Sequence, residues 1–229
     1  MKKTAAFLMA LLLTAGCLFA LAGCGKRCTA ADLSAYLDEE GFVAGMTQLG
    51  LQEIAKRYTG TDPVDGAYYD GESVVGWRAS GENYSFESGC RASEDEKTAT
   101  CKNSFSTSKN LSGLTLPCGI RFSDTIEKVL KRLSIEFDAE KDFDQYYDAP
   151  LWSEDDKKLY LIDMNGCVIP EDGIGQFRLQ YTEIFTAVTS DGREERVIRS
   201  LGFYFDSKDA DLRLFTMSVT EEFDVRQSE

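Results

Sequence analysis

The residues best suited to bind a ligand are the acidic and aromatic side chains between Phe137 and Lys158. Eight carboxylates lie in this stretch, interleaved with rings that include Tyr146, Tyr147 and Trp152. Aromatic rings stack on sugar faces or cations, and carboxylates accept hydrogen bonds from hydroxyls and amines. The same composition is typical of a long acidic loop whose rings attach it to the core. The stretch is therefore a candidate binding loop, with a purely structural role as the alternative.

The sequence offers little for catalysis. It contains no histidine, which excludes Ser-His and Cys-His nucleophile pairs and most zinc sites. The segment from Ser106 to Lys109 fits the S-x-x-K spacing, but neither S-D-N nor K-T-G occurs to complete such a site. Hydrolysis by a carboxylate pair needs two opposed acids, and no pattern in the sequence places two of them opposite each other. We expect a protein that is not an enzyme and that binds no cofactor or metal.

Five cysteines lie downstream of residue 24, at positions 28, 90, 101, 118 and 167. If the segments around Cys90 and Cys101 form a hairpin, pairing these two residues also pairs Phe86 with Phe105 on the same face. This register favours a Cys90–Cys101 disulfide, which an oxidising compartment outside the cytosol permits. Cys118 and Cys167 could form a second bridge and leave Cys28 unpaired, or the cysteines could remain buried thiols.

The N-terminus has the pattern of a secretory signal, because Lys2 and Lys3 precede an uncharged, largely apolar run. The end of this run, Leu21-Ala22-Gly23-Cys24, resembles a bacterial lipobox, which implies cleavage before Cys24 and a diacylglyceryl group on its thiol. Two acyl chains hold a protein stably on a bilayer. We therefore expect a lipoprotein signal peptide at 1–23, a lipidated tether at 24–30, and anchoring to the extracytoplasmic face of the cell membrane.

The chain is strongly acidic, with 39 Asp+Glu against 25 Lys+Arg. Loss of Lys2 and Lys3 with the signal takes the net charge from −14 to −16. Such a charge disfavours binding to nucleic acid or to anionic lipid, so contact with the membrane has to come from the anchor. The aromatic content of 11% is typical of a globular protein.

Two segments have the apolar spacing of amphipathic helices. In the central segment, 114–133, the apolar residues are Ile126, Val129, Leu130 and Leu133, and in the earlier one they are Leu51, Ile54, Ala55 and Tyr58. Asp124 followed by Glu127 is typical of a capping box that starts the central helix. The two patterns align at an offset of 75 residues, which suggests an internal duplication. A short helix is also expected from Thr29 to about Asp38.

Alternating apolar and polar residues predict strands at 73–79, 83–90, 99–107, 158–164 and 212–220, and a hairpin around Ser190-Asp191-Gly192. The hairpin register pairs Tyr181 with Leu201, Leu179 with Phe203, Phe177 with Phe205 and Phe185 with Val197. Glu183 then lies opposite Arg199 on the same face. This ion pair indicates either a partly buried recognition site or a half-exposed part of the sheet.

The expected fold class is α+β, with amphipathic helices packed on an antiparallel sheet and a tandem duplication of a helix-plus-sheet unit as a further prediction. We expect one subdomain at 31–110, a second at 111–222, and an acidic tail at 223–229.

The stretch 112–117 (Ser-Gly-Leu-Thr-Leu-Pro), the Gly119-Ile120 pair and the helix at 125–133 resemble a motif in uncharacterised lipoproteins of clostridial gut bacteria. They are more distantly similar to the helix-plus-sheet domains of the β-lactamase inhibitor protein and of the SmpA/OmlA outer-membrane lipoproteins. Ser123 and Ser134 stand where the wider pattern has glycine. The resemblance implies an α+β fold and binding to other proteins, and it supplies no catalytic residues.

Together these patterns predict a lipid-anchored binding or scaffold module of the cell envelope that contacts a protein or a wall component. The rival hypothesis is a small-ligand or glycan binder that uses the stretch 137–158.

Overall fold

The computed structural model describes residues 28–42, 48–60, 66–70, 73–92, 98–108, 111, 113–136, 150–163, 176–188, 194–206 and 213–226. The helices in this part of the chain are α2 (Asp32–Glu39), α3 (Gln48–Thr59), α4 (Ile126–Arg132) and the short 3-10 helix η1 (Pro117–Gly119). The strands are β1 (Gly66–Asp70), β2 (Ser73–Gly81), β3 (Tyr84–Ala92), β4 (Thr98–Thr107), β5 (Trp152–Glu154), β6 (Lys157–Asp163), β7 (Gln176–Val188), β8 (Glu194–Asp206) and β9 (Arg213–Arg226).

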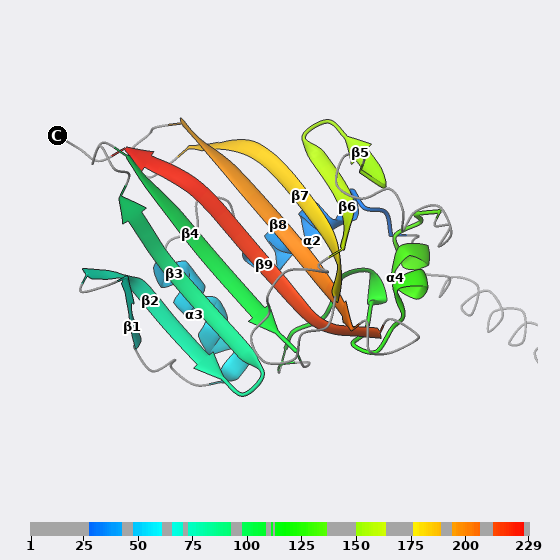
Figure 1. Cartoon of the computed structure of the whole chain (residues 1–229), viewed down its shortest axis with the longest axis horizontal. Helices are drawn as coiled ribbons and strands as arrows, with labels where there is room; N and C mark the ends of the chain where they lie inside the picture. Colours follow the sequence, from blue (N-terminus) through cyan, green and yellow to red (C-terminus); the bar gives the residue numbers. More distant parts are fainter. Residues whose placement is uncertain are drawn as a thin grey trace, which may run out of the picture.

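All nine strands belong to one antiparallel sheet in the order β1-β2-β3-β4-β9-β8-β7-β6-β5 (Figure 1). The pairing of β4 with β9 joins the strands of the two halves of the chain. The α+β class is therefore confirmed, and the two predicted subdomains contribute to a single sheet. Strand β9 is longer than predicted, since it extends past Thr220 to Arg226.

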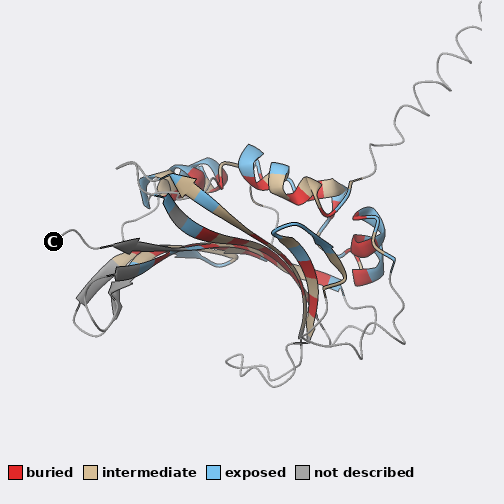
Figure 2. Ribbon diagram, turned by 90° about the horizontal axis from the view of Figure 1, so that it is seen from above, coloured by how far each residue is buried: buried red, intermediate tan, exposed pale blue. Residues whose placement is uncertain are grey.

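The helices α2, α3 and α4 lie along the convex side of the bent sheet (Figure 2). Their buried residues share one core with a row of apolar side chains that runs across six neighbouring strands. The row consists of Phe86, Phe105, Val219, Leu201, Tyr181 and Leu159, each directly opposite the next. Side chains on alternate residues point to opposite faces of a sheet. One face is therefore built for the core, and the residues between belong to the other face.

The predicted register of the β7–β8 hairpin is confirmed at all four apolar pairs. The register of β3 and β4 is likewise as predicted, with Phe86 opposite Phe105 at a ring separation of 4.6 Å. In each case a one-residue slip would move the apolar set to the other face, so burial of one face fixes the pairing.

Helix α4 is where predicted, but its cap is different. The N-cap is Thr125, whose hydroxyl accepts from the amide of Lys128 at 3.4 Å, so the predicted cap at Asp124 is wrong. The carboxylate of Asp124 instead accepts from the amide of Arg121 at 2.9 Å and pairs with Arg132 at 3.3 Å. Ser123 and Ser134, which flank the helix, both have positive φ, at 77° and 57°. This backbone conformation favours glycine.

The second disulfide differs from the predicted alternative. Cys28 pairs with Cys118, with Cα atoms 5.3 Å apart, so a Cys118–Cys167 bridge is wrong. Cys167 lies outside the described residues. The bridge connects the segment that precedes α2 to η1, and the Ser134 hydroxyl also donates to the Cys28 carbonyl at 3.1 Å. The start of the described chain is thus fixed to the central segment. No helix among the described residues is long and apolar enough to cross a bilayer.

Candidate functional site

A row of polar side chains, here called the polar row, crosses the helix-covered face beside the apolar row. It consists of Ser88, Asn103, Glu221, Arg199 and Glu183, each opposite the next on neighbouring strands. All five residues are buried, and Glu183 and Arg199 are each only 3% exposed. A buried charge costs several kcal/mol unless it is paired and hydrogen-bonded. The partners of this row therefore decide whether the core is stable.

Arg199 lies within the polar row and connects three parts of the chain. Its guanidinium binds the carboxylate of Glu183, donates to Asp38 of α2 at 2.7 Å, and donates to the carbonyl of Phe42. The second carboxylate oxygen of Glu183 accepts from the Tyr181 hydroxyl at 2.9 Å. The arginine thus holds α2 and the residues after it against the sheet.

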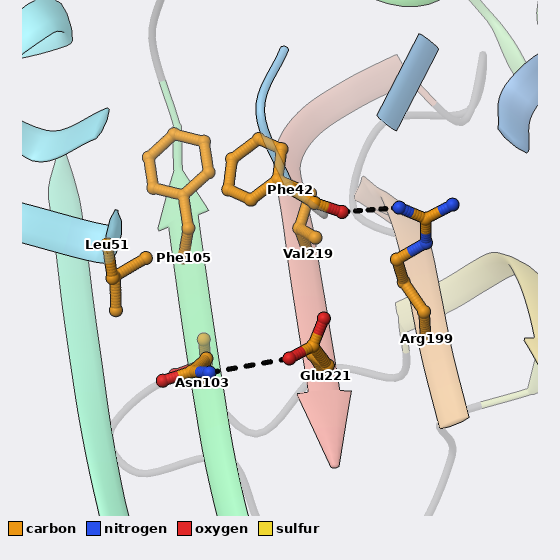
Figure 3. A pocket seen from close by; sticks show the side chains of 8 residues that line it. Phe42, Leu51, Asn103, Phe105, Arg199, Val219 and Glu221 are labelled. Carbon is orange, nitrogen blue, oxygen red and sulfur yellow. Dashed lines mark hydrogen bonds between the residues drawn. The ribbon is translucent and has the colours of Figure 1, made fainter. Parts of the chain in front are cut away.

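The structure shows how exposed the predicted Glu183–Arg199 ion pair is. The half-exposed interpretation is wrong, because both residues are buried and Arg199 also contacts α2. Figure 3 shows the surroundings, where Phe42, Leu51, Phe105 and Val219 line the space beside Asn103 and Glu221. Asn103 donates to Glu221 at 3.5 Å. The space enclosed by these described residues would not hold a water molecule. We interpret the polar row as structural.

Three tyrosines have phenol groups that are largely shielded from solvent, Tyr36 on α2, Tyr58 on α3 and Tyr181 on β7. Burial raises the pKa of the phenols of Tyr36, Tyr58 and Tyr181, with a hydrogen bond to Glu40 adding to the effect at Tyr58 and the charge of Glu183 adding at Tyr181. The Tyr36 hydroxyl is buried without a hydrogen-bond partner. These phenols therefore remain protonated in the folded state at a pH where free tyrosine has lost its proton.

We expect the free energy of unfolding to fall as pH rises above about 10, where the tyrosines of the unfolded chain ionise. Below that pH both states hold these protons, so the contribution is fully present. Urea unfolding at pH 8, 10 and 11 measures it. Tyr36→Phe is the matched variant, since it removes no hydrogen bond, and it should show a smaller loss between pH 8 and pH 11 than the unmodified chain. An equal loss in both proteins would contradict the assignment.

The opposite side of the sheet, here called the uncovered face, is concave, and no described helix lies on it (Figure 2). Its side chains form rows of small polar groups across β4, β9, β8 and β7. One row is Ser104, Thr220, Ser200 and Thr182, and the next is Ser106, Ser218, Gly202 and Gln180. The hydroxyls of Thr182 and Ser200 lie 3.1 Å apart. Except for buried Gly202, these residues are half-buried, so the face is rich in hydrogen-bonding groups that solvent or a partner can reach.

The candidate residues of the sequence are only partly described. Tyr146, Tyr147 and the lipidation candidate Cys24 lie outside the described residues. Trp152 opens β5, opposite Leu159, and its ring stacks on Tyr181 at 6.5 Å. The indole is therefore packed against the edge of the core. Cys90 and Cys101 face each other across β3 and β4 and are bonded, with an S–S distance of 2.03 Å.

An open cleft of about 470 Å³ lies between α2 and η1. Its lining includes the Cys28–Cys118 bridge, Tyr36 and the acidic residues Glu39 and Glu40. The Glu40 carboxylate already accepts from the Tyr58 hydroxyl and pairs with Arg57 at 3.4 Å. Part of the acidic lining is therefore used by the fold itself.

The fold defines an α+β protein whose single antiparallel sheet has helices on its convex face and a hydroxyl-rich concave face. Comparisons of the chain with protein-family models, with curated proteins and with solved structures found no match. The sequence pattern did contain the signal for the uncovered face, because serine and threonine alternate with apolar residues along β4 and β9. It was not recognised as a candidate site.

Proposed function

We propose that this protein is a lipid-anchored module of the cell envelope that binds a protein or wall component with the uncovered face of its sheet. The observation that carries the proposal is the asymmetry of the sheet. One face is closed by helices, and the other presents half-buried hydroxyl and amide groups on a concave surface. A concave surface with many hydrogen-bonding groups suits a specific, moderately polar interface.

The position of the Cys28–Cys118 bridge supports the anchored part of the proposal. Cys28 follows Cys24 by four residues, which span at most about 14 Å when extended. Because Cys28 is bonded to the folded part, a lipid on Cys24 would hold the sheet close to the bilayer with little freedom. The module would then meet partners that lie near the membrane surface.

The duplication of a helix-plus-sheet unit also remains a proposal. The strand order supports it, since β1 to β4 and β6 to β9 run inward from the two sides and meet at β4 and β9. The helices are less symmetrical. Helix α3 packs against β3, whereas the polar contacts over β8 come from α2, which belongs to the first predicted subdomain.

Site-directed photo-cross-linking in intact cells tests the proposed interface. A photoreactive residue at Ser106 or Thr220, on the uncovered face, should give a discrete cross-linked product with the native tether in place. The matched control is the same residue at exposed Glu53 of α3. Products at Glu53 and none on the sheet would overturn the proposal.

The Cys24→Ser variant tests the anchor separately. It should be released from the membrane fraction or remain as uncut precursor, and it should lose the cross-links that depend on location. Normal retention of the variant in membranes would contradict lipidation at this residue.

A further inference from the structure

Three side chains converge over Gly202 on the uncovered face. A Cβ built on this glycine would lie 3.0 Å from the Ser218 hydroxyl, 3.2 Å from the Tyr204 ring and 3.5 Å from Cδ of Arg178. Gly202 is opposite both Gln180 and Ser218 in the strand register. Because Gly202 has no side chain, the side chains of Arg178 and Tyr204 can pack against its backbone.

The polar groups of this cluster are directed at one another and leave capacity for a further partner. Arg178 lies 5.8 Å from the centroid of the Tyr204 ring, and its Nη1 donates to the Tyr204 hydroxyl at 3.4 Å. The Ser218 hydroxyl donates to the same oxygen at 3.3 Å. With two donors directed at its oxygen, the phenol keeps its own proton available to donate outward.

Arg178 has no carboxylate partner among the described residues. Its Nε is buried without a hydrogen bond, although the residue as a whole is half-exposed. Two other arginines of the sheet differ in this respect, since Arg199 pairs with Glu183 and Arg78 with Glu87 at 3.1 Å. A desolvated guanidinium that lacks a counter-charge gains free energy when an anion reaches its exposed side.

The charges of the uncovered face differ from those of the chain. The chain has many more acids than bases. Among the residues of this face whose burial the structure describes, however, the cations outnumber the anions. The cations are Arg78, Lys102, Lys158, Arg178, Arg196 and Arg213, and the anions are Glu87, Glu194 and Glu222. A negatively charged group therefore meets less repulsion on this face than the net charge of the chain suggests.

We propose that Arg178, Tyr204 and Ser218 form a carboxylate-binding subsite on the uncovered face, which takes an Asp or Glu side chain of a protein partner. Arg178 supplies the charge and a planar pair of donors, and the Tyr204 hydroxyl donates to the carboxylate. Ser218 donates its proton to the Tyr204 oxygen and so orients that hydroxyl. A protein partner is favoured over a polyanion because an isolated carboxylate can reach this arginine without bringing many charges to a molecule of net charge −14. The proposal rests on the proposed function and names the chemistry of its partner.

Fluorescence anisotropy with the full chain in detergent tests the subsite. The probes are a labelled peptide of Ala and Gly with a single Glu and the matched peptide with a single Gln in its place, with polyphosphate as a competitor. The Glu peptide should bind the unmodified chain, and Arg178→Gln should weaken binding about tenfold, the effect of losing a hydrogen bond to a charged group. The matched control Arg78→Gln removes an arginine already paired with Glu87 and should leave the affinity within about twofold.

Three results would overturn the subsite. They are equal binding of the Glu and Gln peptides, equal losses in the two arginine variants, and binding of polyphosphate more tightly than the Glu peptide. Circular dichroism of each variant ensures that only folded protein is compared. The proposed function is judged independently, because cross-linking at Ser106 or Thr220 that persists in Arg178→Gln would keep the interface and remove the subsite.

Discussion

Replacing Arg199 by methionine is expected to cost about 3–5 kcal/mol of unfolding free energy, the range found when one partner of a buried ion pair is removed. Methionine has similar length and fills the space, so little of the loss comes from a cavity. The loss arises because Glu183 remains buried without its cation and because Asp38 of α2 and the Phe42 carbonyl after it lose their contacts with Arg199. Urea unfolding followed by circular dichroism should show a lower midpoint with an unchanged slope.

Two further variants identify the cause of that loss. The double variant Glu183→Leu/Arg199→Met removes both charges of the pair and should recover at least half of it, since apolar replacements of a buried ion pair are often neutral. Arg196→Met changes an exposed arginine of the same strand and should cost less than about 0.5 kcal/mol. An Arg199→Met variant within about 1 kcal/mol of the unmodified chain would show that the polar row does not hold the core together.

The sequence predicts that Glu183 and Arg199 lie opposite each other, but it does not predict that they are buried. Facing follows from the alternation of side chains along a hairpin whose four apolar pairs allow one register, so local information is sufficient. Burial of this pair depends on α2 and Phe42, which lie more than 140 residues away in the chain. No periodicity within the strands specifies which helix covers which part of the sheet. The interpretation of a half-exposed pair failed for that reason.

The difference between local and long-range information also explains why one disulfide was predicted correctly and the other was not. Cys90 and Cys101 lie on adjacent strands of one hairpin, and their pairing follows from the register that also aligns Phe86 with Phe105. Cys28 and Cys118 are 90 residues apart. Cys28 lies before α2 and Cys118 lies in η1, so no strand register predicts that they pair. The alternation of polar and apolar residues along β4 and β9 does predict which side chains lie on the uncovered face. Its importance depends on where the helices lie, which only the fold shows.

Removing the Cys28–Cys118 bridge is expected to be the other large effect. In the chain-entropy model a bridge restricts the unfolded chain more when it closes a longer loop. The loop here has a sequence separation of 90, against 11 for Cys90–Cys101. The double variant Cys28→Ser/Cys118→Ser should therefore lose about 4–5 kcal/mol of unfolding free energy, and Cys90→Ser/Cys101→Ser about 3 kcal/mol.

The Cys28–Cys118 bridge has a second effect that the Cys90–Cys101 bridge of the β3–β4 hairpin lacks. Without it, Cys28 is held only through the Ser134 hydrogen bond and its neighbours in α2, so the segment that follows the proposed lipid site gains freedom. The serine variant should then expose the peptide bonds near residue 28 to protease, whereas Cys90→Ser/Cys101→Ser should leave them protected. Urea unfolding of both double variants, followed by limited proteolysis with mass spectrometry, separates the two effects. If the hairpin variant loses more stability, or if both variants are cut equally near residue 28, the longer bridge does not fasten the tether.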